Sequence, residues 1–260
     1  MNRLDAVFAR RGRKALIAYV TAGYPSMAAT LEVVPLLAAH GCDIVELGVP
    51  FSDPLADGAT IQSASQQALK QGVDVRACLD MVRDLRARVS APLVLMGYYN
   101  PVLSFGEEAF CDACHQSGVD GLIIPDLPPE EAGGLEKCAR PAGLSIIYLL
   151  APNSSQERIR LVAERSRGFI YLVSVAGTTG ARRKLPADLE SFVSRVRQET
   201  SKPLCVGFGV STAEEARRVA KVADGVIVGS RLIQLLGQRP YTALTGFVGE
   251  LRKALDEAGA

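Results

Sequence analysis

Short apolar runs recur along the chain, and most of them are apolar at nearly every position instead of alternating with polar residues. Such runs are typical of strands in a parallel sheet that is covered on both faces. Many of the stretches between them carry apolar residues at helical spacing. The sequence therefore predicts strands alternating with helices, with the strands at 16–20, 43–49, 92–98, 121–124, 144–149, 169–174, 203–208 and 225–228.

Eight strands in one chain favour a closed barrel. A (β/α)8 barrel has about 250 residues and this chain has 260, whereas a doubly wound open sheet usually has fewer strands or a second domain. No linker or charge block divides the sequence, so we expect an α/β fold with a single (β/α)8 TIM barrel domain over residues 1–260. An amphipathic segment at 4–9 predicts an extra N-terminal helix, and residues 99–101 are expected in a loop. The other helices are expected at 26–40, 62–70, 75–89, 107–116, 130–139, 155–165, 187–199, 231–236 and 241–258.

The charge balance excludes some classes of partner. The 29 basic and 28 acidic residues nearly cancel, which gives no bulk attraction to nucleic acid or to an anionic membrane. No apolar run approaches the roughly 18 to 20 residues of a membrane span, and the N-terminus lacks the apolar segment of a secretory signal. We therefore expect a cytoplasmic protein without a nucleic-acid or membrane partner, while an anionic small molecule stays open as a ligand.

The Cys and His residues do not favour metal chemistry. The six Cys are scattered through predicted helices and strands, where reduced buried thiols are expected. Cys111, Cys114 and His115 have no second ligand pair at the spacing of a zinc site. The chain has only two His, so neither a metal site nor histidine-based catalysis is expected.

One carboxylate interrupts the second apolar run. Glu46 lies between Val45 and Leu47, and a second carboxylate, Asp57, follows in the next predicted loop. Removing an unpaired ionised carboxylate from water is costly, so Glu46 has a partner, or a raised pKa, or a place in a substrate site. The strand by itself supports equally well a structural carboxylate that accepts hydrogen bonds from backbone N–H groups.

The active face of a barrel lies at the C-terminal ends of its strands. Glycines after the seventh and eighth strands, next to a helix N-terminus, are typical of a phosphate site, although strand ends also favour Gly for turns and Ser230 is an ordinary helix N-cap. The Gly- and Thr-rich stretch at 176–181 is either a lid or a plain connection. With Glu46 and Asp57, the candidates on this face are Tyr171, Thr179, Gly180, Gly209, Gly229 and Ser230.

The stretch 46–58, Glu-Leu-Gly-Val-Pro-Phe-Ser-Asp-Pro-Leu-Ala-Asp-Gly, resembles the signature of the tryptophan synthase alpha chain family. The resemblance covers essentially the whole chain, because weaker family motifs follow in the expected order at 98–101, 125–128, 149–152, 177–181, 206–210 and 228–230. It implies a (β/α)8 lyase that cleaves indole-3-glycerol phosphate into indole and glyceraldehyde 3-phosphate by a retro-aldol reaction.

The resemblance also implies residue roles. Glu46 would be the general acid and base, and Asp57 would hydrogen-bond the indole N–H and stabilise the charged indolenine. Thr179 would order the loops over the site, and Tyr171 would lie beside it. The apolar walls around the indole would be Tyr19, Ile61 and Phe208. The phosphate would contact Gly180, Gly209, Gly229 and Ser230.

Family members work in an α2β2 complex and pass indole to a β chain that carries pyridoxal phosphate. The resemblance therefore implies no cofactor on this chain and a partner-facing surface that includes Asp53, Pro54, Asn100 and Pro101.

Other functions stay open from the sequence. A free-standing indole-3-glycerol phosphate lyase would carry the same residues, and a non-catalytic activator of the β chain is expected to have lost one of the two carboxylates. A sugar-phosphate epimerase of the same fold needs a set of His and Asp metal ligands, which two unrelated His do not provide.

Overall fold

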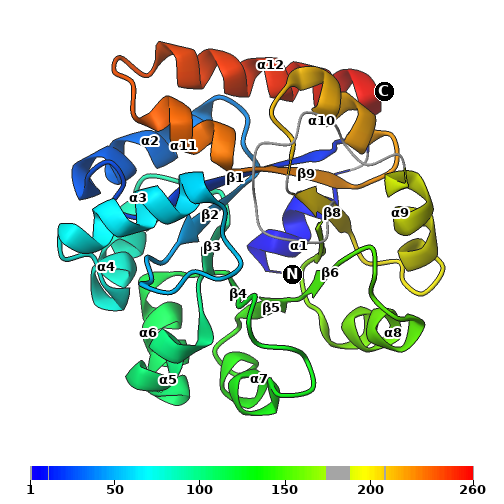
Figure 1. Cartoon of the computed structure of the whole chain (residues 1–260), viewed down its shortest axis with the longest axis horizontal. Coiled ribbons are helices and arrows are strands. Elements are labelled where there is room, and N and C mark those ends of the chain that lie inside the picture. The colour runs from blue at the N-terminus through cyan, green and yellow to red at the C-terminus, as the bar shows by residue number, and fades with distance from the viewer. Residues whose placement is uncertain (1, 11, 174–187, 208, 260) are drawn as a thin grey trace.

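Parallel strands form a ring at the centre of the molecule, and the helices surround it (Figure 1). The computed structural model describes residues 2–10, 12–173, 188–207 and 209–259. The strands pair in the order β5-β4-β3-β2-β1-β9-β8-β7-β6, and every pair is parallel. The strands are β1 (Ala15–Thr21), β2 (Ile44–Gly48), β3 (Leu93–Met96), β4 (Gly121–Ile123), β5 (Ser145–Ile147), β6 (Leu149–Leu150), β7 (Ile170–Val173), β8 (Leu204–Gly207) and β9 (Gly225–Val228).

The predicted strand 144–149 is divided in two at Tyr148. β5 pairs with β4, and β6 pairs with β7. Between them, the backbone N–H of Tyr148 donates to Ser166 Oγ (3.2 Å), and the backbone N–H of Tyr171 donates to the Tyr148 carbonyl (3.0 Å). The ring therefore continues through one bent strand, and the expected (β/α)8 barrel is confirmed.

The helices are α1 (Arg3–Phe8), α2 (Met27–Ala39), α3 (Ala59–Lys70), α4 (Val75–Arg86), α5 (Tyr99–Phe105), α6 (Glu107–Ser117), α7 (Gly133–Ala139), α8 (Gln156–Arg165), α9 (Leu189–Arg197), α10 (Ala213–Ala220), α11 (Ser230–Leu236) and α12 (Thr242–Gly259). The expected N-terminal helix is α1, whose Leu4 is fully buried. Leu4 lies beneath the ring, because a Cβ added at Gly121 or Gly168 would lie 3.1 or 3.3 Å from Leu4 Cδ1.

The prediction of a loop at 99–101 is wrong. These residues form the first turn of α5, where Pro101 is tolerated because the N–H groups of a first turn have no partner within the helix. Tyr98 at the N-cap makes no capping hydrogen bond through its side chain. Instead, Asp126 accepts from the backbone N–H of Tyr99 (2.9 Å). The cap of this helix therefore comes from a residue far away in the sequence.

Asp43 joins β1 to β2 at the N-terminal end of the barrel. It directly precedes β2, and its Oδ2 accepts from the backbone N–H of Leu16 (3.0 Å), while its own N–H donates to the Leu16 carbonyl (2.8 Å). The carboxylate also accepts from the guanidinium groups of Arg13 and Arg252 (2.9 Å each). The buried carboxylate is thus fully partnered, and it fixes the relative position of two strands.

The same arrangement occurs twice more around this end of the barrel. An aspartate directly precedes β4, and another precedes β9. The carboxylate of each accepts from the backbone N–H of a leucine in the neighbouring strand, its own N–H donates to the carbonyl of that leucine, and it has an arginine partner. These triplets are Asp120 with Leu93 and Arg86, and Asp224 with Leu204 and Arg197.

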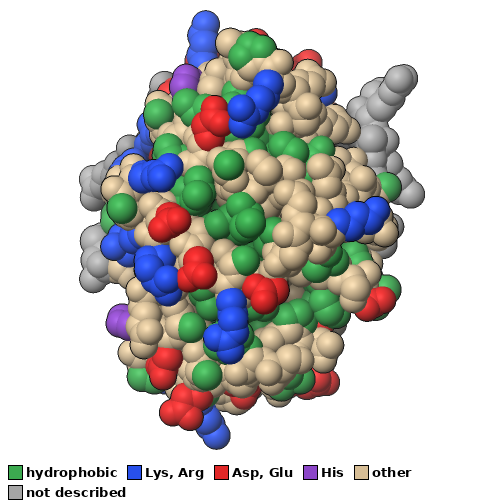
Figure 2. All heavy atoms as spheres, turned by 90° about the vertical axis from the view of Figure 1, so that its left-hand side faces the viewer, with side chains coloured by type: hydrophobic (Ala, Val, Ile, Leu, Met, Phe, Trp, Pro, Cys, Tyr) green, Lys and Arg blue, Asp and Glu red, His purple; other side chains and the backbone are tan. Residues whose placement is uncertain are grey.

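Charged side chains of both signs are interspersed on the side of the barrel that carries α2 and α4 (Figure 2), in agreement with the near-zero net charge. In the part of the chain that the structure describes, no helix is both long and apolar enough to cross a membrane.

Replacing Asp43 with Asn should destabilise the barrel by about 3 to 5 kcal/mol, because the buried guanidinium of Arg252 loses its buried carboxylate partner and keeps only the exposed carboxylate of Asp256. Urea unfolding measures this loss. Asp80→Asn removes an exposed carboxylate that pairs with Arg83 and is the matched control, expected to change stability little. Equal midpoints for the two variants would contradict the structural role of Asp43.

Candidate active site

Glu46 is the central residue of β2, in register with Tyr19 of β1 and Val94 of β3. Its side chain is fully buried, and among the described residues neither carboxylate oxygen has a hydrogen-bond partner. The alternative of a carboxylate held by backbone N–H groups therefore has no support in this part of the chain. An unpartnered carboxylate at such a depth is rare in proteins and is typical of a functional group.

Burial controls the protonation of Glu46. Removing the carboxylate from water raises its pKa to about 8. A carboxyl group with this pKa is mainly protonated at neutral pH but loses its proton readily, so it can both donate and accept a proton there.

Asp57 lies in the loop between β2 and α3 and is 9% exposed. Burial raises its pKa to about 6, while a hydrogen bond from the Tyr98 hydroxyl to Oδ2 (3.1 Å) acts in the opposite direction. Asp57 is therefore mostly ionised at neutral pH, when Glu46 is mostly neutral. Two carboxyl groups with separated pKa values are suited to different tasks.

Tyr98 is a residue of this site that the sequence analysis did not identify. Its hydroxyl donates to Asp57 and accepts from the backbone N–H of Ala56 (3.0 Å), and its ring stacks on Phe51 with 5.2 Å between centroids. It thus holds both ends of the loop that carries Asp57. The motif at 98–101 was the available signal, but its residues indicated only a family and a partner surface.

Tyr19 and Tyr171 lie inside the barrel and take equivalent positions on two pairs of strands. A Cβ added at Gly48 would lie 2.6 Å from Tyr19 Cζ, and one added at Gly207 would lie 2.6 Å from Tyr171 Cζ. Each glycine is two residues beyond the register partner of its tyrosine, so both rings lean toward the C-terminal ends of the strands. These two positions have no side chain because a ring occupies the space.

Both tyrosines share their surroundings with the carboxyl groups. Burial raises the pKa of Tyr19 and of Tyr171, and the next contribution is the negative charge of Asp57 for Tyr19 and of Glu46 for Tyr171. The structure therefore brings β1, β2, β7 and the loop after β2 to one interior space. Ile61, in the first turn of α3, is also buried.

The candidate phosphate residues lie after β8 and β9. Gly209 has a positive φ of 96°, which glycine adopts without strain. Ser230 begins α11, and a Cβ added at Gly229 would lie 3.4 Å from Tyr19 Cβ, so the backbone here passes close to the tyrosine. Thr179, Gly180 and Phe208 lie outside the described residues.

The expected partner-facing residues lie in two neighbouring segments. Asp53 and Pro54 are in the loop after β2, and Asn100 and Pro101 are in the first turn of α5. Leu55, next to Pro54, is 83% exposed, and Leu103 of α5 is 52% exposed.

Within residues 2–10, 12–173, 188–207 and 209–259, no group of three or more His, Cys, Asp or Glu side chains is placed to hold a metal ion. A (β/α)8 barrel with a buried carboxyl group that lacks a partner in the described chain is typical of an enzyme of this fold. A model of the family described as tryptophan synthase alpha chain matches residues 6–253. The chain therefore belongs to the tryptophan synthase alpha chain family.

Individual relatives agree with this assignment. The tryptophan synthase alpha chain of Dehalococcoides mccartyi is 55% identical over 257 residues, which cover 98% of this chain and 100% of that one. That of Geobacter sulfurreducens is 48% identical over 264 residues, with 98% and 99% covered. The crystal structure of tryptophan synthase subunit alpha from Legionella pneumophila matches with a TM-score of 0.91 at 36% identity and covers 99% of each chain.

The pH dependence of stability tests the burial of Glu46. Below about pH 4.5 this group is neutral in the folded and unfolded chains; as pH rises from 4.5 to about 8, only the unfolded chain ionises it, so folding stability falls. The Glu46→Gln variant lacks this loss. The free energy of unfolding of the variant minus that of the wild type should therefore increase across this pH range by up to about 5 kcal/mol.

Urea unfolding at pH 5 and pH 8 measures the difference. Glu164→Gln, which removes an exposed carboxylate from α8, is the control. If the difference in free energy of unfolding between Glu46→Gln and the wild type is the same at both pH values, Glu46 ionises as readily in the folded chain as in the unfolded one, and its burial does not raise its pKa.

Proposed function

We propose that this chain cleaves indole-3-glycerol phosphate into indole and glyceraldehyde 3-phosphate, with Glu46 and Asp57 as its catalytic residues. Membership of the tryptophan synthase alpha chain family assigns it to tryptophan biosynthesis as the lyase subunit. The observation that carries the residue assignment is the buried, unpartnered carboxyl of Glu46, which shares one interior space with Asp57.

The reaction needs a proton donor and a proton acceptor at neighbouring atoms. A proton is added to C3 of the indole, the hydroxyl on the adjacent glycerol carbon loses its proton, and the carbon–carbon bond between them breaks. The electron pair of that bond returns to the ring, so the products are neutral indole and an aldehyde. Glu46, with its pKa of about 8, gives the first proton and is restored by the second, so one carboxyl serves both steps.

Asp57 has a different role because it is ionised. Addition of a proton at C3 places positive charge on the indole nitrogen, and a carboxylate hydrogen-bonded to that N–H stabilises the charge. The hydrogen bond from Tyr98 favours the ionised form of Asp57 and holds its loop.

The remaining residues bind the substrate in this proposal. Tyr19 and Tyr171 are buried near the two carboxyl groups, and Ile61 is buried in the first turn of α3. We assign these side chains to the walls around the flat apolar ring. Gly209, Gly229 and Ser230 contact the phosphate. By resemblance to the family, the set also includes Thr179, Gly180 and Phe208.

Alpha chains of this family pair with a β chain and generally have no cofactor of their own. We infer an α2β2 complex in which pyridoxal phosphate belongs to the β chain and no cofactor belongs to this one. We propose the surface around Asp53, Pro54, Asn100 and Pro101 as the docking face for the β chain, because the exposed apolar side chains of Leu55 and Leu103 lie beside it. We further propose that residues 1–260 act as one domain and that the protein is cytoplasmic.

Glu46→Gln should lower kcat for indole release from indole-3-glycerol phosphate by about 100-fold to 10 000-fold, the usual contribution of a proton-transfer group. Asp57→Asn should lower it by about 100-fold to 1 000-fold, the usual cost of removing one group that stabilises charge in the transition state. Indole release is measured with and without a β chain, which also separates a free-standing lyase from a partner-dependent one. Binding of glycerol phosphate should persist in both variants. Full activity of Glu46→Gln would overturn the assignment of Glu46 as a catalytic residue. A wild type that releases no detectable indole with or without a β chain would indicate a non-catalytic activator.

Tyr98→Phe should move the acid limb of the kcat/KM profile to higher pH. Loss of the hydrogen bond raises the pKa of Asp57 further above about 6, so the variant should lose severalfold more activity at pH 6 than at pH 8. Tyr99→Phe is the control, because the Tyr99 hydroxyl bonds to Glu107 on α6. A Tyr98→Phe profile that overlays the wild type would contradict this positioning role.

A further inference from the structure

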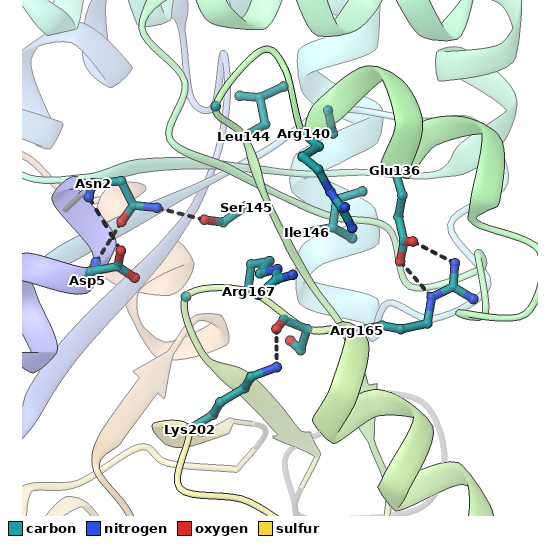
Figure 3. Close-up of a pocket in the computed structure, with 14 residues that line it drawn as sticks. Asn2, Asp5, Glu136, Arg140, Leu144, Ser145, Ile146, Arg165, Arg167 and Lys202 are labelled. Carbon is teal, nitrogen blue, oxygen red and sulfur yellow. Dashed lines mark hydrogen bonds and ion pairs between the residues drawn. The ribbon is translucent and has the colours of Figure 1, made fainter.

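A polar hollow lies at the N-terminal end of the barrel, opposite to the catalytic face. Its volume is about 380 Å³, and it opens between the start of α1, the end of α7, the start of β5 and the segment that leads from α8 into β7 (Figure 3). This volume lies in the range of pockets that hold small metabolites, roughly 300 to 1,000 Å³. The charged side chains that line it are Asp5, Glu136, Arg140, Arg165, Arg167 and Lys202.

Both acids of the hollow are engaged by neighbours. The carboxylate of Glu136 accepts two hydrogen bonds from Arg165 (2.9 and 2.7 Å) and one from the Tyr148 hydroxyl (2.6 Å). Asp5 completes the capping box of α1 with Asn2. Glu136 is thus paired with Arg165, while the charge of Arg140 acts on it without an ion pair or a hydrogen bond.

Two of the four cations are engaged as well. Arg165 is held by Glu136, and the ammonium of Lys202 donates to the carbonyls of Ala163, Glu164 and Ser166 at the end of α8 (2.5, 3.0 and 2.7 Å). Burial lowers the pKa of Lys202, and the positive charge of Arg167 lowers it further. The hollow therefore has a positive excess that its own carboxylates do not balance.

Arg140 and Arg167 are the two remaining cations of the hollow. In the described part of the chain, neither guanidinium has an ion pair or a hydrogen bond, and both line the hollow. Figure 3 shows their side chains directed into the space between α7 and the segment before β7. Two guanidinium groups that line one space without a hydrogen bond or ion pair of their own match the charge and the oxygen geometry of a phosphate dianion.

We propose that this hollow is a second anion site, in which Arg140 and Arg167 bind the phosphate group of a small phosphorylated metabolite. The remaining volume accommodates the organic part of such a molecule. The site is separate from the proposed phosphate residues after β8 and β9, because its residues precede the strands and those follow them.

Occupancy of the hollow would join two parts of the barrel wall. Arg140 follows α7, and the backbone N–H of Arg167 donates to the Ile146 carbonyl of β5 (2.9 Å). Ser166, also in this segment, holds the backbone N–H of Tyr148 at the break between β5 and β6. A phosphate between the two arginines would therefore brace the barrel where its fifth strand is interrupted, and it should raise Tm.

Isothermal titration with inorganic phosphate tests the proposal. The wild type should bind two equivalents, and the Arg140→Gln/Arg167→Gln variant should bind one, with the affinity of the second site weakened at least about tenfold. Gly229→Asp, which alters the proposed catalytic phosphate site, should also bind one equivalent and should still gain Tm on addition of phosphate. Arg218→Gln/Lys253→Gln removes two exposed cations elsewhere and should behave as the wild type.

The outcomes separate this site from the proposed catalytic function. Two equivalents of wild-type affinity in Arg140→Gln/Arg167→Gln would overturn the second site. Two equivalents in Gly229→Asp, with one in the arginine variant, would leave the hollow as proposed and overturn the catalytic phosphate residues. Citrate is the carboxylate probe, and binding of citrate without phosphate at the hollow would overturn the assignment to a phosphorylated ligand. Cleavage of indole-3-glycerol phosphate by the arginine variant should equal that of the wild type.

Discussion

The desolvation of a single carboxyl group, that of Glu46, is the constraint on which the site depends. Strands of a parallel barrel are apolar on both faces, so a carboxyl in the middle of β2 is surrounded by side chains instead of water. The same surroundings that raise its pKa to about 8 also destabilise its ionised form. The barrel must therefore tolerate an unfavourable group at the position where that group is useful.

The two ends of the barrel treat their carboxylates in opposite ways. At the N-terminal end, Asp43, Asp120 and Asp224 each accept a backbone hydrogen bond and pair with arginine, and they fix neighbouring strands to one another. At the C-terminal end, Glu46 has no partner in the described chain and Asp57 has only the hydroxyl of Tyr98 among side chains. Acids with full sets of partners stabilise the scaffold, and acids with few or none remain available to interact with a ligand.

The break at Tyr148 connects these two ends. Because β5 and β6 do not form one continuous strand, the segment around Ser166 supplies hydrogen bonds that the ladder lacks there. The same segment forms a wall of the hollow with the unpaired Arg167, and it leads directly into β7, which carries Tyr171 into the catalytic interior. Hydrogen bonds from this segment thus support the ring where its strand is interrupted.

The sequence by itself determined the barrel, its approximate strand positions, the family and the anomaly of Glu46, because these follow from runs of residues that are adjacent in the chain. Contacts between distant residues were decided only by the tertiary structure.

The Tyr98 hydroxyl donates to Asp57, which lies 41 positions away in the sequence. Asp126, which lies 27 positions from Tyr99, caps α5, so residues 99–101 are helical instead of forming the expected loop. Likewise, the space that Tyr19 and Tyr171 take above Gly48 and Gly207 depends on strand register, and the pairing of charges in the hollow depends on which helices meet there. Local pattern specifies which elements form, whereas the register and docking of those elements decide which polar groups find partners.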